Sequence, residues 1–200
     1  AQSRAFIRSM LDALGYETSH HTVDVGEGHV SLLGSREKAN GAPLLWIMEA
    51  FCEESCDVLE TAPRSEQLND LDSLLKDVKY DGVITSHVLT LPEPPRWVIL
   101  VSAYQIVLID RAKWAQKRFL RFDLSEIFGR KEDLTLKAFT VLLHRDTLTP
   151  LDGMSLLDTL DENSHKHAFG VTEDLKYALR ESIEILANEA IYAKLQSGEN

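Results

Sequence analysis

The feature that most constrains the fold is a nearly unbroken apolar run at residues 43–51, PLLWIMEAF. A strand with apolar side chains on both faces is expected inside a sheet whose two faces are covered. Asn40 and Gly41, just before the run, are typical of a tight turn. The run is far shorter than the roughly 18 residues of a membrane span. We therefore predict a buried strand here.

Helical and strand-like segments surround this run. Residues 2–14 have apolar side chains at helical spacing, and Gly15 follows as a C-terminal cap, so a first helix is expected. Residues 80–91 fit either a helix or a strand. Further strands are expected at residues 20–25, 29–33, 97–102, 105–110 and 119–122, and further helices at residues 64–76, 124–128, 134–144, 153–160 and 172–195.

The resulting order of helix, three strands, helix and strand is that of the core of PD-(D/E)xK nucleases. We therefore predict an α/β fold of this restriction-endonuclease-like type, with a mixed sheet flanked by helices and a C-terminal helical extension. The nuclease-like core is expected over residues 1–123 and the extension over residues 124–200. Because no linker rich in glycine or proline separates them, we expect the extension to pack on the core as one structural unit.

Such nucleases hold Mg²⁺ with an acid on the second strand and an acid-x-Lys motif on the third, where the lysine helps to activate water. Here the third strand supplies Glu49, but Phe51 stands in the lysine position. The second strand contains no acid, and the nearest acids are Asp24 and Glu27. We expect Glu49 to be a vestige, held by a local hydrogen bond or ion pair, and no residue here to be catalytic.

One basic segment stands out from an acidic chain. The formal net charge of −11 argues against a surface that binds nucleic acids indiscriminately. Residues 111–131, however, carry seven cationic and two acidic side chains, which gives +5 and leaves −16 elsewhere. Cations interleaved with Trp114 and Phe119 suit contacts with DNA phosphates and bases, or else pairing with acids of this domain. The candidate DNA-binding residues are Arg111, Lys113, Lys117, Arg118 and Arg121.

Two other polar groups are interpreted as structural rather than metal-binding. Cys52 and Cys56 lie four residues apart without a second pair at zinc-finger spacing, so reduced structural thiols are expected. The polar stretch DENSHKH at residues 161–167 is expected in a loop before a helix, where such side chains cap backbone groups. No metal site is predicted.

Several stretches of this chain resemble one family of large proteins. They are APLLWIMEA, EPPRWVILVS, VLIDRAKWAQKRFLRFDLSEIFGR and LLDTLDENSHKHAFGVTEDLKYALRESIEILANEAI. They look like the amino-terminal region of single-chain type IIG restriction-modification and phage-defence proteins, which are adenine-specific DNA methyltransferases. The resemblance covers most of the chain and implies a nuclease-like or degenerate region that leads into the methyltransferase. It also implies S-adenosylmethionine as a cofactor of the parent protein.

These observations lead to one prediction and two alternatives. The chain is expected to be an inactive nuclease-like domain that positions duplex DNA or docks the methyltransferase part of the same protein. It lacks the Asn-Pro-Pro-aromatic motif and a complete G-x-G-x-x-G motif, so no cofactor is expected within it. The alternatives are an active Mg²⁺-dependent endonuclease using Glu49 with Asp24 or Glu27, and a pure protein-interaction module.

The ends of the chain also support expectations. The chain begins at Ala1 and stops on a polar tail, which suggests a domain of a longer protein. The amino end lacks the apolar stretch and cleavage site of a signal peptide. A cytoplasmic location without membrane attachment is therefore expected.

Overall fold

A computed structural model describes residues 2–26, 28–64, 67, 75–166, 176 and 179–180 of the chain. The chain divides into two compact units, residues 1–152 and residues 153–200.

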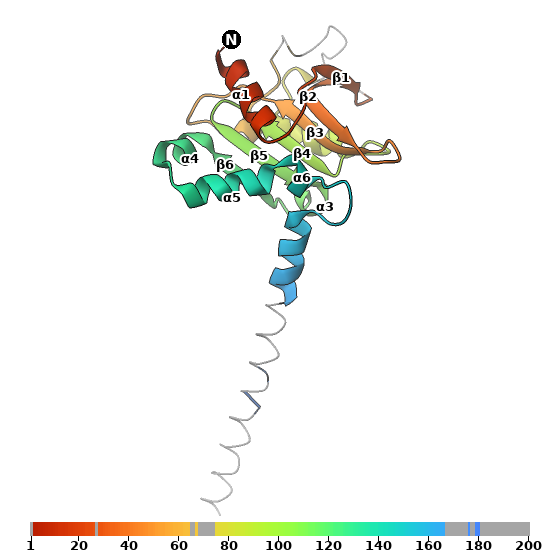
Figure 1. The fold of residues 1–200 in the computed structure, drawn as a ribbon. Coiled ribbons are helices and arrows are strands. Elements are labelled where there is room, and N and C mark those ends of the chain that lie inside the picture. The colour runs from red at the N-terminus through yellow and green to blue at the C-terminus, as the bar shows by residue number, and fades with distance from the viewer. Residues whose placement is uncertain are drawn as a thin grey trace, which may run out of the picture. The chain divides into compact units, whose positions relative to one another are not determined.

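Six strands in the described part of the first unit form one sheet, in the order β1-β2-β3-β4-β5-β6 (Figure 1). They are β1 (His21–Asp24), β2 (His29–Glu37), β3 (Pro43–Glu49), β4 (Trp97–Val101), β5 (Gln105–Asp110) and β6 (Phe119–Asp123). Strands β3 and β4 pair in parallel, and the other neighbours pair antiparallel. The predicted mixed α/β sheet is confirmed.

The crossover that joins β3 to β4 covers one face of the sheet. A parallel pair needs such a connection because the chain must return to the edge where β3 began. The described part of the crossover holds η1 (Val58–Glu60), α2 (Tyr80–Val83) and the π-helix η4 (Ile84–Val88). Residues 80–88, which fitted helix or strand, are thus helical, whereas most of the helix expected at residues 64–76 lies outside the described residues.

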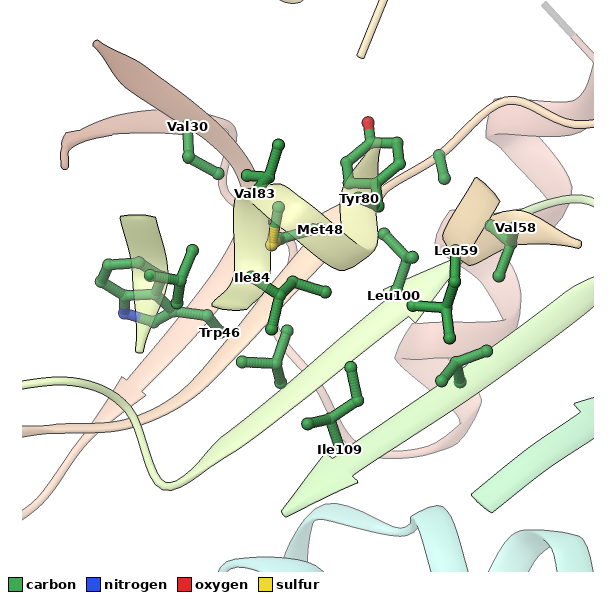
Figure 2. Close-up of a cluster of buried hydrophobic side chains, with 14 of the residues drawn as sticks. Val30, Trp46, Met48, Val58, Leu59, Tyr80, Val83, Ile84, Leu100 and Ile109 are labelled. Carbon is green, nitrogen blue, oxygen red and sulfur yellow. The ribbon is translucent and has the colours of Figure 1, made fainter. Parts of the chain in front are cut away.

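Alternate residues of the strands face this crossover. Met48 and Leu100 point from neighbouring strands toward Tyr80 and Ile84, and all four are buried in one cluster (Figure 2). Every residue of β4 is buried, because the opposite face of the sheet is covered as well. The apolar run at residues 43–51 therefore lies inside the sheet, as predicted, and β3 ends at Glu49.

Helices cover the opposite face. Helix α1 (Gln2–Ala13) buries Ile7 and Leu11 in this layer, and Gly15 follows it with a φ of +84°, which suits a C-terminal cap. Phe139 on helix α5 (Asp133–Leu143) packs edge-on against Phe122 of β6, with ring centroids 5.6 Å apart. The Tyr16 hydroxyl donates a 2.8 Å hydrogen bond to the Leu143 carbonyl, which ties the end of α1 to α5.

The first unit extends beyond the boundary expected at residue 123. Helices α4 (Leu124–Arg130), α5 and α6 (Arg145–Leu148) belong to it, and the division between units falls after Asp152. The reason is that Leu124, Leu143 and Leu148 are buried side chains of these helices. Whether residues 153–200 pack on the core stays a prediction.

The second unit corrects one local expectation. Residues 156–166 are helical, so the loop expected at residues 161–167 is wrong for residues 161–166, and His167 lies outside the described residues. The Ser155 hydroxyl caps the helix by accepting a hydrogen bond from the Asp158 amide at 3.1 Å. Glu162 and Lys166 then pair one turn apart at 2.9 Å, which favours helix over loop.

Gly34 in β2 provides a test of the packing between β2 and the chain after α1. A Cβ atom at this position would lie 2.9 Å from the backbone carbonyl oxygen of Glu17. Because this neighbour is backbone, Gly34→Ala is expected to lower the free energy of unfolding by about 1–3 kcal/mol. The matched control is Gly129→Ala in α4, where a Cβ meets no atom within 4 Å. There alanine is expected to stabilise the helix by up to about 1 kcal/mol. If urea denaturation gave the same change in the free energy of unfolding for both variants, the close packing at Gly34 would be contradicted.

Candidate site at the end of strand β3

Glu49 ends β3 as a buried carboxylate held by one arginine. Its side chain is 4% exposed, and the Nε atom of Arg4 lies 3.2 Å from Oε1 and 3.1 Å from Oε2. Arg4 comes from the first turn of α1, and its side chain is 47% exposed. A buried charge requires such a partner because removing it from water is costly. The predicted local ion pair of Glu49 is therefore present.

The backbone at Glu49 is also fixed from the crossover side. The Tyr80 hydroxyl and the Gln67 side-chain amide each donate a 2.8 Å hydrogen bond to the Glu49 carbonyl oxygen. Burial raises the pKa of Tyr80, so its hydroxyl stays protonated and remains a donor. The end of β3 is thus held on both sides of the sheet.

Phe51, which stands where a nuclease would have lysine, has two cations over its ring. The guanidinium carbon of Arg4 lies 5.3 Å from the centre of the ring, and that of Arg64 lies 4.4 Å from it. Cation–π contacts of this kind orient a guanidinium group without neutralising its charge. Phe51 therefore serves as a platform for two arginines, which is a different chemistry from a lysine beside a metal.

A hollow of about 650 Å³ lies against this platform. Arg4, Phe51 and Arg64 line it together with Cys52 and Tyr104. Its size falls within the usual range for small-molecule sites, about 300–1,000 Å³.

An active nuclease would need Asp24 or Glu27 beside Glu49. The described residues do not form such a pair. Asp24 ends β1, two strands from β3, and its Oδ1 atom accepts a 2.7 Å hydrogen bond from the amide of Gly26. Glu27 lies outside the described residues. Among the residues that are described, no three His, Cys, Asp or Glu side chains come close enough to hold one metal ion.

The cysteines lie beside the same strand end, and both are free thiols. The Cys52 thiol lies 3.6 Å from the Ser102 hydroxyl. Burial and the neighbouring Cys56 thiol raise the pKa of Cys52 to about 11. The thiol of Cys52 is therefore protonated at neutral pH and a poor nucleophile.

The basic segment, residues 111–131, forms helix α3 (Arg111–Trp114), a turn, β6 and α4. The ammonium group of Lys117 lies 2.6 Å from Asp81 and 4.6 Å from the centre of the Trp114 ring. Arg121 lies 2.7 Å from Asp57, on the chain that follows β3.

The other three candidate cations lie on the same stretch of chain. Arg111 donates a 2.9 Å hydrogen bond to the Pro94 carbonyl, and Lys113 lies in α3. Arg118 makes no side-chain hydrogen bond or ion pair with any described residue. The five candidates thus come from one continuous segment, but at least two of them are paired within the domain.

Sequence reasoning missed Arg4, Arg64, Gln67 and Tyr80. Arg4 and Glu49 are 45 residues apart, and helical periodicity shows only that Arg4 lies on the polar side of α1. The spacing between these residues carries no signal of their contact.

Comparison of the chain with protein-family profiles, curated proteins and solved structures found no match. Within the described residues, no helix has the length and apolar character needed to cross a membrane. The function must therefore be inferred from the residues and their geometry.

Proposed function

We propose that this chain is a nuclease-like, catalytically inactive domain of a cytoplasmic DNA restriction-modification methyltransferase. Its role would be to position duplex DNA or to dock the methyltransferase part. The proposal rests mainly on the end of β3, where Glu49 is neutralised by Arg4 and Phe51 replaces the lysine that a nuclease requires. S-adenosylmethionine would act in the methyltransferase part, not in this domain.

The chemistry of the site supports an inactive domain. A metal-dependent nuclease needs carboxylates that are free to bind a divalent cation. The Glu49 carboxylate is buried and already accepts both of its arginine contacts, so a metal ion would have to displace Arg4. A purified chain is expected not to cleave DNA with Mg²⁺ or Mn²⁺. Cleavage that disappears in Glu49→Gln would instead establish the active nuclease.

Binding of duplex DNA tests the positioning role. Replacing Lys117 and Arg118 by glutamate is expected to weaken binding and to flatten its dependence on salt, because fewer counterions are released. The measurement is fluorescence anisotropy of a labelled duplex over a range of KCl concentrations. The matched control is Lys38→Glu/Lys137→Glu, in which both cations are exposed and lie outside the basic segment. An equal loss in both variants would indicate only a change in net charge.

The ion pairs within the basic segment favour one alternative, a protein-interaction module without DNA affinity. Lys117 and Arg121 already contact Asp81 and Asp57, so their charges are partly compensated inside the domain. Absence of duplex binding by the unmodified chain at low salt would reject the DNA role and leave this alternative.

A further inference from the structure

The arginine pair on Phe51 has hydrogen-bonding capacity that the protein itself does not use. Both bonds to Glu49 come from the Nε atom of Arg4, so the two terminal nitrogens of this guanidinium group make no hydrogen bond with a described residue. The Arg64 guanidinium likewise has no hydrogen bond or ion pair within the described part of the chain. Both groups are nevertheless held in place by the same aromatic ring.

These donors border the 650 Å³ hollow, which also contains two hydroxyl-bearing side chains. Ser3 and Tyr104 line the hollow beside Arg4 and Arg64. Guanidinium groups match the geometry of phosphate oxygens with paired N–H donors, and hydroxyl groups can donate to the remaining oxygens. Their arrangement around a cavity suits a phosphate group better than a metal or a neutral ligand.

Two negatively charged side chains at the hollow would repel an anion. Glu53 and Glu54 line the hollow, and both are exposed to solvent. Exposed carboxylates are screened by water and salt, whereas the arginines are oriented by Phe51. The two glutamates are therefore expected to weaken anion binding without abolishing it.

We propose that this hollow is a binding site for a phosphodiester group, with Arg64 as the main anchor and Arg4 as a second donor. This inference rests on the proposed function in that the phosphodiester would belong to the DNA backbone. The strand end that would be a cleavage centre in an active nuclease would here hold DNA. The site is distinct from the basic segment at residues 111–131.

Duplex binding by the full chain, measured by anisotropy against KCl concentration, tests the site. Arg64→Gln is expected to weaken binding about 3- to 10-fold at low salt and to reduce the slope of log K against log salt by about one. The matched control is Arg8→Gln, which removes an exposed cation from α1 outside the hollow and should leave the slope unchanged. Glu53→Gln/Glu54→Gln should strengthen binding.

A second probe separates failure of this site from failure of the DNA role. The dinucleotide TpT, which carries one phosphodiester, is titrated while NMR follows the arginine Nε–H signals. Shifts at Arg4 and Arg64 without duplex binding would support the site and overturn its DNA role. Duplex binding that is equally strong in Arg64→Gln and Arg8→Gln would overturn the site and leave the proposed function. Shifts as large at Arg8 as at Arg64, or no binding of either probe, would also overturn the site.

Discussion

Leu100→Ala is expected to lower the free energy of unfolding by about 3–4 kcal/mol, since a buried leucine loses both its transfer energy and the packing around it. Leu100 is the fourth of the five residues of β4, is 0% exposed, and packs in the cluster between the sheet and the crossover (Figure 2). The cavity left by alanine would remove packing contacts between β4 and the crossover that connects β3 to β4. The measurement is equilibrium urea denaturation followed by tryptophan fluorescence.

The matched control for Leu100 is Leu120→Ala. Leu120 also lies in a strand, but it is 39% exposed on β6, at the end of the strand order. Its replacement is expected to cost less than about 1.5 kcal/mol, because less apolar surface is lost and solvent fills the space. Similar costs at the two positions would show that β4 is not the centre of the sheet.

Arg4→Met is expected to lower the free energy of unfolding by about 2 kcal/mol. Methionine keeps much of the apolar stem but leaves the 4% exposed carboxylate of Glu49 without its arginine. Removing one partner of a fully buried pair costs about 3–5 kcal/mol, and the partial exposure of Arg4 reduces this figure. Loss of the cation–π contact with Phe51 adds to the cost.

A double-mutant cycle with Glu49→Gln separates the ion pair from other effects of Arg4→Met. The double variant is expected to be more stable than the sum of the single changes predicts, by about 1–2 kcal/mol, because neither charge is then left without a partner. Arg8→Met, an exposed change on the same helix, should stay within about 0.5 kcal/mol of the unmodified chain. Strict additivity in the cycle would contradict the Arg4–Glu49 pair.

The strands of the sheet were largely predictable because burial on two faces leaves a clear mark on the sequence. The run at residues 43–51 and the Val- and Ile-rich segments at residues 97–102 and 105–110 coincide closely with β3, β4 and β5. Residues 80–88 were ambiguous because the spacing of their apolar side chains fits a helix as well as a strand. In the structure this segment is helical, and its side chains Tyr80, Val83 and Ile84 are buried in the cluster beside the sheet.

The candidate site was only half predictable. Glu49 and Phe51 could be located because Glu49 ends a strand whose position the apolar run defines, and Phe51 follows two residues later. Their partners could not, because Arg4 approaches from α1 and Arg64 from the crossover. Similarly, the sequence suggested that the basic segment could pair with acids of the domain, but not that Lys117 would meet Asp81.

The sequence by itself determined the order of the six strands and of helices α1, α4 and α5, the central place of residues 43–51 and the absence of a lysine after Glu49. These properties depend on periodicity and on residues close together in the chain, so they are visible without coordinates. Only the tertiary structure decided that β3 and β4 run in parallel, that Arg4 neutralises Glu49, and that two arginines share the ring of Phe51. The physical reason is that such contacts join distant residues, and packing of the whole sheet selects them.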